Sequence, residues 1–192
     1  MKKEWCIVGK IFITSDWHFG HDKEFLYRPR GFDSIQEHDE KVIMRHNLTV
    51  TDEDDVFVLG DLMLGDQEYG LNCISRLNGK IHIIVGNHDT INKLAQYQTL
   101  PNVVEVIGWA LMYKYGKYRF YLSHYPTLTG NYDDKSPKQC VINIHGHTHQ
   151  SYSMDINQWN MYHAGLDSHQ CYPVLLDDII EDIENNYLTY KK

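Results

Sequence analysis

The chain has 192 residues, of which 42% are hydrophobic and 23% charged, and its formal net charge is −8. This length and composition predict a globular protein in which residues 1–192 form one domain around one core. The negative charge argues against broad electrostatic binding to nucleic acid or to an anionic membrane. No apolar run approaches the length of a membrane span, and the N-terminal MKKEWCIVG is a poor signal peptide, so we expect a cytoplasmic protein.

The cysteines are few and widely spaced. Cys6, Cys73, Cys140 and Cys171 form no C-x-x-C pair. The pattern therefore predicts neither a zinc ribbon nor a disulfide framework, and it fits a reducing compartment.

Short apolar and β-branched runs predict strands along the chain, with no internal repeat or linker between them. These strands cover residues 11–15, 56–59, 81–85, 103–107, 109–114, 118–123, 140–144 and 161–165. The segment Tyr115-Gly116-Lys117 stands between two of the runs and predicts a hairpin turn.

Helical patterns alternate with these runs. Ser34 and Glu37 form a capping-box pattern that predicts a helix start, and a second helix runs from about Asp66 to a stop at Asn78-Gly79. A short helix is expected over 91–98. Near the C-terminus an apolar face of period 3.6 predicts a last helix whose acidic residues form a solvated face.

Five of the apolar runs end in polar residues of the same kind. They are IFITSDWH, VFVLGD, IHIIVGNHD, YRFYLSH and CVINIHGHTH. In an open α/β sheet, binding sites form at the carboxyl ends of the strands, so five separate segments can bring these residues to one place. The residues that would meet there are Asp16, His18, Asp61, Asn87, His88, His124, His147 and His149.

Carboxylate, amide and imidazole donors together suit Mn²⁺, Fe or Zn²⁺ and leave no role for thiolates. The set is too large for one ion and suits two, with one carboxylate shared. Each motif alone is common, because Asp and Asn are also good turn and cap residues. Five such motifs in one chain, each at the same end of a strand, favour a metal centre.

In order and spacing, D-x-H, G-D, G-N-H-D, H and G-H-x-H resemble the five motifs of the calcineurin-like metallophosphoesterases. The resemblance spans about residues 11–150, and the HFGH variant of the first motif resembles the small bacterial and phage phosphoesterase branch. It implies an α/β (α+β) fold, a four-layer sandwich of two mixed β-sheets flanked by helices, with a two-metal centre between the sheet edges.

The resemblance also implies a role for each residue. One metal would be held by Asp16, His18, Asp61 and His149. The other would be held by Asp61, Asn87, His124 and His147, so that Asp61 bridges the two. We expect two divalent ions, Mn²⁺ first, with Fe, Zn²⁺ or Ni²⁺ as alternatives.

These residues predict metal-dependent hydrolysis of a phosphate ester at a dinuclear centre. The substrate we place first is a small phosphodiester. Two ions about 3.5 to 4 Å apart can share a hydroxide that attacks the phosphorus. The expected catalytic residues are His88, Asp61 and Asn87, with His88 as the general acid for the leaving group. The positive charge of two divalent ions exceeds the negative charge of two carboxylates and one hydroxide. The centre is therefore weakly positive and attracts a phosphate locally.

Several nearby residues have an open role. His21 is either a phosphate contact or a structural histidine, and Asp89 either orients His88 or, the interpretation we place first, caps the following helix. His145 is expected beside the site rather than as a ligand, and the change to histidine at His163 leaves the role of residues 161–167 open. The polar loop 125–139 either gates the substrate or simply connects two strands.

Three alternatives remain for function. The same site would serve a phosphomonoesterase or a nuclease, although Lys114, Lys117 and Arg119 are a weak basic footprint for nucleic acid. A non-catalytic metal-binding scaffold would be expected to lose site residues, whereas every expected ligand is present here. The expected partner is thus a small phosphorylated substrate, with no membrane; the oligomeric state is left open.

Overall fold

A computed structural model describes residues 9–130, 135–155 and 158–192. Cys6, the N-terminal segment and part of the loop 125–139 lie outside the described residues. The first sheet has the strand order β4-β3-β2-β1-β9. Its strands β1 (Ile11–Thr14), β2 (Asp55–Val58), β3 (Lys80–Ile84) and β4 (Val103–Ile107) are parallel, and β9 (Val174–Leu175) pairs antiparallel with β1.

The second sheet has the order β5-β6-β7-β8. Its strands are β5 (Ala110–Tyr115), β6 (Tyr118–Ser123), β7 (Val141–His145) and β8 (Met161–His163). The β5–β6 pair is an antiparallel hairpin that turns through Gly116 and Lys117, as predicted, and the other pairs are parallel. Both sheets are therefore mixed.

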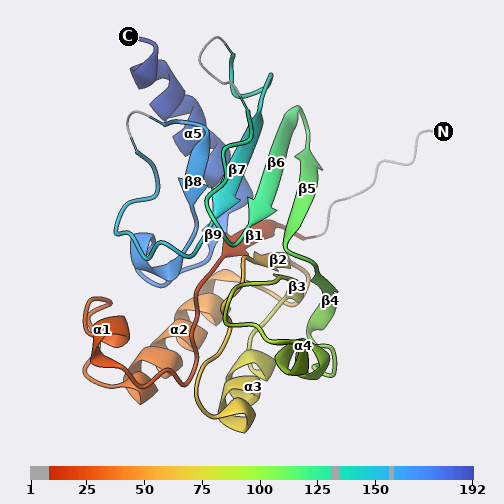
Figure 1. Cartoon of the computed structure of the whole chain (residues 1–192), viewed down its shortest axis with the longest axis vertical. Helices are drawn as coiled ribbons and strands as arrows, with labels where there is room; N and C mark the ends of the chain where they lie inside the picture. Colours follow the sequence, from red (N-terminus) through yellow and green to blue (C-terminus); the bar gives the residue numbers. More distant parts are fainter. Residues whose placement is uncertain (1–8, 131–134, 156–157) are drawn as a thin grey trace, which may run out of the picture.

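Four helices cover one face of the first sheet, below it in Figure 1. They are α1 (Glu24–Tyr27), α2 (Ile35–Thr49), α3 (Gln67–Ser75) and α4 (Ile91–Tyr97). Because side chains alternate along a strand, Phe12, Val56 and Val58 face these helices while Ile13 and Phe57 face the second sheet. Each such side chain that is fully buried stabilises the fold by roughly 1.5–3 kcal/mol.

The fifth helix, α5 (Leu176–Tyr190), follows β9 directly. Its buried Leu176, Ile179 and Ile183 belong to the same apolar cluster as the facing sides of the two sheets. Asp182 of α5 accepts a hydrogen bond from Tyr162 of β8, on the same face of the second sheet that contacts Phe57. The acidic residues Asp177, Asp178 and Glu181 are exposed, as the periodicity predicts.

The predicted fold class, two mixed sheets with flanking helices, is confirmed, but the helices flank the sheets unevenly. Among the described elements, none of the helices packs on the outer side of the second sheet, where Met112, Lys114 and Arg119 are exposed. Instead α5 lies beside the first sheet on the inner side, because its apolar stripe joins the cluster between the sheets. Within the described part of the chain, none of the helices combines the length and hydrophobicity that crossing a membrane requires.

Candidate metal centre

The loops after β1, β2, β3, β6 and β7 meet at one edge of the two sheets. The loops after β1 and β2 run side by side, and the backbone N–H groups of Asp16, His18 and Phe19 donate to the carbonyl oxygens of Gly60, Asp61 and Leu62. The parallel pairing of the two strands therefore continues into the loops. This gives the side chains at the edge a rigid mount, which a metal or catalytic site requires.

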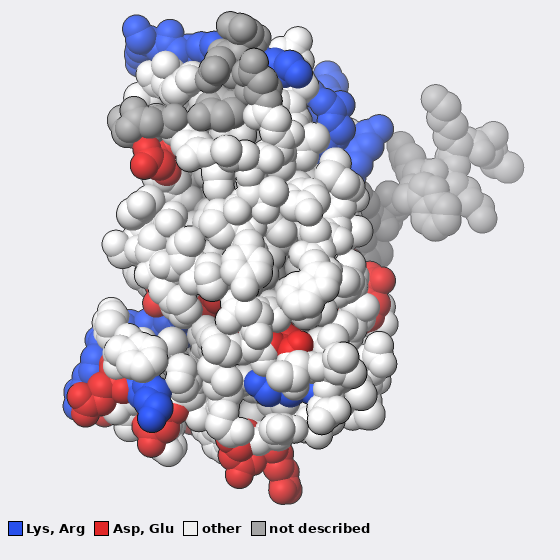
Figure 2. Space-filling model, in the orientation of Figure 1, with Lys and Arg blue, Asp and Glu red and all other residues white. Residues whose placement is uncertain are grey.

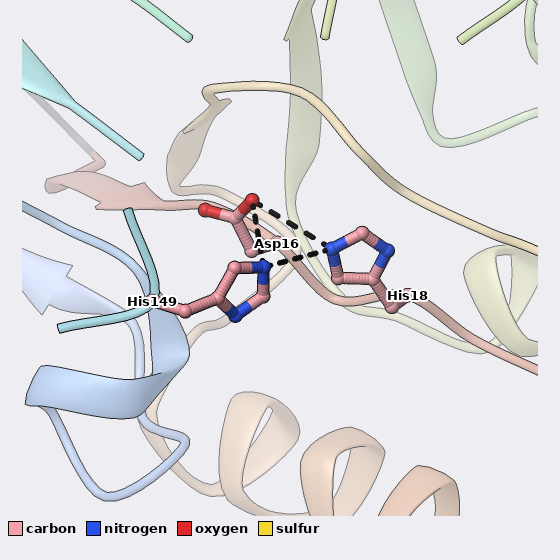
Figure 3. A group of neighbouring side chains, drawn as sticks. All are labelled: Asp16, His18 and His149. Atoms are coloured by element: carbon pink, nitrogen blue, oxygen red, sulfur yellow. Dashed lines mark hydrogen bonds and ion pairs between the residues drawn. The ribbon is translucent and has the colours of Figure 1, made fainter. Parts of the chain in front are cut away.

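Asp16, His18 and His149 form the first group of possible ligands (Figure 3). The Nε2 atoms of His18 and His149 lie 3.2 Å apart, and each lies 3.8 Å from Oδ1 of Asp16. Figure 3 shows the three side chains converging on one point from two separate loops.

Asp16, Asp61 and His124 form the second group. Oδ2 of Asp61 lies 3.4 Å from Nε2 of His124 and 3.8 Å from Nε2 of His18, so this oxygen reaches both groups. Asn87 Oδ1 and His147 Nδ1 complete the second side, at 2.8 and 3.2 Å from Nε2 of His124. All seven residues expected to bind metal therefore come together, with Asp16 common to both groups.

The donor set fits a pair of divalent cations. Oδ1 of Asp16 is buried and, among the described residues, has no hydrogen-bond partner. A buried carboxylate oxygen without a partner is costly unless a cation or a proton satisfies it. The carboxylate, amide and imidazole donors around it are those that first-row divalent metals accept.

The pKa values of the site residues are shifted in different directions. Burial raises the pKa of Asp16 and lowers the pKa of His18 to about 2. Burial also acts to raise the pKa of Asp61, but hydrogen bonding and charge at His124 and the backbone N–H of His88 outweigh it and lower that pKa to about 2. His18 is therefore a neutral imidazole and Asp61 a carboxylate, the forms that bind metals.

Five of these residues have left-handed backbone conformations. The φ angles are 60° at Asp16, 51° at His18, 58° at Asp61, 68° at His147 and 47° at His149. Asp and His tolerate this region better than most side chains, but it still stores strain. Strained backbone conformations of this kind cluster at functional sites, where the surrounding structure holds them in place.

Two glycines let the loops approach the carboxylates closely. A Cβ on Gly86 would lie 2.3 Å from Oδ1 of Asp61, and one on Gly146 would lie 2.4 Å from Oδ2 of Asp16. Any larger residue would push a carboxylate out of the position described above. The glycines of G-N-H-D and G-H-T-H are therefore required by packing against the site.

Asp89 does not cap the following helix, so the interpretation placed first from the sequence is wrong. The N-cap of α4 is Thr90. The carboxylate of Asp89 instead accepts hydrogen bonds from the backbone N–H groups of Asp61, Leu62 and Gly86 and from the hydroxyl of Tyr97. It ties the loop after β3 to the loop after β2, because unpaired N–H groups in two adjacent buried turns need an acceptor.

The sequence leaves the role of residues 161–167 open and gives no indication of Arg30, but the structure makes Asp167 and Arg30 functional candidates. Nε and Nη2 of Arg30 donate to the two carboxylate oxygens of Asp167 at 2.9 and 2.8 Å, and Nη2 also donates to the backbone oxygen of Asp16 at 3.0 Å. Asp167 accepts from Nδ1 of His149 at 2.9 Å. An aspartate beside a metal-binding histidine is a common orienting pair, but only the fold reveals this one.

His88 and His21 line a cavity of about 590 Å³ that opens beside His18 and His149. The side chain of His88 is 45% exposed, and its Nε2 lies 4.0 Å from Oδ2 of Asp61. Burial and the neighbouring His88 and Lys23 lower the pKa of His21, so a neutral imidazole faces the cavity there.

His145 and His163 are buried beside the site rather than in it. Nδ1 of His145 bonds to the carbonyl oxygen of Gly146, and the rings of the two histidines lie 5.5 Å apart. Burial and neighbouring His145 lower the pKa of His163 to about 3. His145 therefore lies beside the site, as expected, and contacts the G-H-T-H loop, whereas Nδ1 of His163 bonds to the hydroxyl of Ser168.

Comparison with known proteins agrees with this geometry. A family model described as the calcineurin-like phosphoesterase superfamily domain matches residues 10–166. The chain is 32% identical over 149 residues to the uncharacterized protein MJ1445 of Methanocaldococcus jannaschii, covering 76% of this chain and 72% of that one. It is 28% identical over 184 residues to the Gene 66 protein of Mycobacterium phage L5, covering 84% and 88%.

A solved structure shares the fold. The protein of unknown function AQ665 from Aquifex aeolicus aligns with a TM-score of 0.66 at 18% identity, covering 90% of this chain and 98% of that one. Since the family model spans most of the chain, the protein belongs to the calcineurin-like phosphoesterase superfamily. It is a hydrolase that acts on phosphoric ester bonds, in a family that depends on metals.

Proposed function

We propose that the protein hydrolyses a small phosphodiester at a dinuclear centre that prefers Mn²⁺, with His88 as general acid. The observation that carries this proposal is the convergence of five possible ligands, Asp16, His18, Asp61, His124 and His149, at one place on the edge of the sheets. When bound, two divalent ions supply an activated water and hold the phosphoryl oxygens for in-line attack.

The residues of the chain would divide the remaining work. Asp16 and Asp61 contribute two negative charges and the other ligands are neutral, which leaves a net attraction for one anionic phosphate. Among the described residues that line the cavity, none is lysine or arginine. A phosphodiester carries a single negative charge, whereas a phosphomonoester carries nearly two negative charges at neutral pH. A cavity without lysine or arginine therefore suits the diester better.

His88 is positioned to protonate a leaving oxygen. Its backbone N–H donates to Oδ1 of Asp61 at 2.8 Å, and its carbonyl accepts from Nζ of Lys93 at 2.9 Å. The backbone is thus fixed on both sides while the ring stays half exposed at the cavity. In the proposed reaction, Nε2 of His88 donates a proton to a leaving group that lies beside it in the cavity.

The face of the molecule shown in Figure 2 gives no support to a nuclease. On the face shown in Figure 2, Lys and Arg side chains lie in separate places: at the end that carries the β5–β6 hairpin and the C-terminus of α5, beside α1, and near α4. The middle of that face carries few charges. A basic stripe that tracks a nucleic-acid backbone is not visible on this face.

The experiment is hydrolysis of bis(p-nitrophenyl) phosphate beside p-nitrophenyl phosphate, after chelation and after Mn²⁺ is added back. We expect Mn²⁺ to restore cleavage of the diester in the wild type but not in Asp61→Asn. Asp178→Asn, an exposed aspartate on α5, is the matched control and should behave as wild type. Cleavage of the monoester alone would contradict the diester assignment, and a metal-loaded protein inactive on both esters would support the scaffold alternative.

His88→Ala tests the proposed acid. Removal of a general acid typically costs about 10²–10⁴-fold in turnover, and since His88 is outside the proposed ligand set, the bound metal should stay at two ions. Metal content by mass spectrometry and turnover are measured on the same sample. Unchanged turnover in this variant would exclude His88 as the acid.

A further inference from the structure

The cavity beside the metal centre is lined by two unlike kinds of side chain. The imidazoles of His18, His88 and His149 and the carboxylate of Asp167 are polar. Phe25, Leu26, Pro29 and Leu64 are apolar. The phosphate of a substrate belongs beside the metal-binding residues, which leaves the apolar side chains for whatever is esterified to it.

Three of the four apolar residues, Phe25, Leu26 and Pro29, belong to α1 and the segment that follows it, and Leu64 lies in the loop after β2. Leu26 and Tyr27 are buried and fasten this four-residue helix to the core. Phe25, one position earlier, points away from the core and is 72% exposed. Its one described aromatic neighbour is His21, with the rings edge-to-face and 5.6 Å apart.

Folding does not account for the exposed ring of Phe25, because a polar residue there would leave the buried contacts of α1 unchanged. The rings of His18 and His21 lie 5.6 Å apart, so an unbroken row of rings leads from the candidate metal centre to Phe25. Aromatic faces and edges next to aliphatic side chains favour a planar, uncharged group.

Size and charge agree with such a group. The cavity volume of about 590 Å³ lies within the usual range for small-molecule sites, roughly 300–1,000 Å³. A benzene ring needs a cavity of only about 150 Å³, which leaves room for the phosphate. The guanidinium of Arg30, close by, is already bonded to Asp167 and His38, so it is not available to a second phosphate.

We propose that the wall formed by Phe25, Leu26, Pro29 and Leu64 binds an uncharged aromatic substituent of the ester. The substrate class is then an aryl or similarly planar ester of a single phosphate, rather than a sugar phosphate or a polyphosphate. This inference rests on the proposed function, because it assumes that the phosphate sits at the metal centre.

The experiment measures binding rather than turnover. Phenylphosphonate and methylphosphonate carry the same acidic head and differ in the group that would reach the apolar wall. Isothermal titration calorimetry of the Mn²⁺-loaded protein gives both dissociation constants. We expect phenylphosphonate to bind at least tenfold more tightly, since one methylene in an apolar pocket is already worth roughly 10–200-fold.

Variants locate the preference on the wall. In Phe25→Ala the ratio of the two dissociation constants should fall toward one, and in Phe25→Tyr, which keeps the ring, it should stay high. Leu48→Ala is the matched control, because Leu48 on α2 is also 72% exposed and does not line the cavity. Thermal unfolding of each variant confirms that it is folded.

Equal affinities for the two phosphonates, no detectable binding of phenylphosphonate, or a ratio unaffected by Phe25→Ala would each overturn the inference. Failure of the proposed function looks different. If the protein binds phenylphosphonate more tightly but hydrolyses no ester, the proposed reaction is wrong and the aromatic site stands. If the protein cleaves the diester but binds both phosphonates equally, the aromatic site is wrong and the proposed reaction stands.

Discussion

Asp167 accepts a hydrogen bond from Nδ1 of His149, and this contact decides which ring nitrogen of His149 faces the candidate metal centre. With the proton held on Nδ1, the lone pair of Nε2 points at Asp16. Burial would raise the pKa of Asp167, but hydrogen bonds from His149 and Arg30 hold it far below its usual range. The carboxylate is therefore charged and keeps His149 oriented.

Asp167→Asn should weaken metal binding about 10- to 100-fold, the usual effect of losing a group that orients a metal-binding histidine. Competition with a chromophoric chelator for Mn²⁺ or Zn²⁺ measures the affinity. Asp182→Asn is the control, because Asp182 on α5 accepts a hydrogen bond from Tyr162 and does not belong to the metal-binding groups. Asp167→Glu keeps the charge and should recover part of the affinity. Metal affinity equal to wild type in a folded Asp167→Asn protein would show that His149 needs no such partner.

At the scale of elements, α2 begins with a cap that differs slightly from the pattern in the sequence. Oγ of Ser34 accepts the N–H of Glu37 at 3.2 Å, as the capping box predicts. The carboxylate of Glu37 accepts the N–H of Asp33, one residue before the cap. The start of α2 thus depends on two side-chain hydrogen bonds to the backbone.

Ser34→Ala should lower the free energy of unfolding by about 1 kcal/mol, the typical cost of removing an N-cap side chain. Urea denaturation at constant metal concentration measures it. Ser75→Ala is the control, because Ser75 is exposed at the end of α3 and its loss should change stability by less than about 0.5 kcal/mol. Equal losses in the two variants would mean that the cap does not stabilise α2.

The elements that the sequence predicted are those with a long apolar signal. The strands of both sheets and the helices α2 to α5 match within a few residues, because their buried side chains repeat with the period of the element. The two-residue β9 and the four-residue α1 were not predicted. Neither is long enough to show a period, and α1 has no capping side chain.

At the scale of the whole molecule, buried histidines link stability to pH. His46 of α2 is buried, with Nε2 bonded to the carbonyl oxygen of Asn78, and burial lowers its pKa from the ordinary 6.5 to about 4. In the unfolded chain this histidine is protonated below pH 6.5, whereas in the folded protein it stays neutral down to about pH 4. Its contribution to stability is complete above pH 6.5 and is lost as the pH falls toward 4.

His46→Gln removes this titration while keeping a donor for Asn78. Between pH 7 and pH 5 the wild type should lose about 2 kcal/mol more unfolding free energy than the variant, the value expected from the two pKa values. Denaturant melts at both pH values, with metal removed, measure the difference. Parallel pH profiles for the two proteins would contradict the neutral, buried state of His46.

The candidate site was predictable where it follows strands and not where it depends on contacts between distant segments. Asp16, Asp61 and His124 each follow a strand, and the ends of neighbouring strands meet at one edge. Asp167 and Arg30 follow no such rule, since 137 positions separate them and only the fold brings them together beside His149. Asp89 lies in a motif, but its acceptor role depends on a turn after β2 that only the fold brings near.

The left-handed conformations of Asp16, His18, Asp61, His147 and His149 also concern how the chain can change over generations. Each costs roughly 1–2 kcal/mol more than glycine would at the same position. The backbone conformation alone would therefore favour glycine at the three histidines, whereas the two aspartates also accept backbone hydrogen bonds that glycine would lose. Glycine at the histidine positions of a relative would indicate a protein that has kept this fold after losing its metal-binding chemistry.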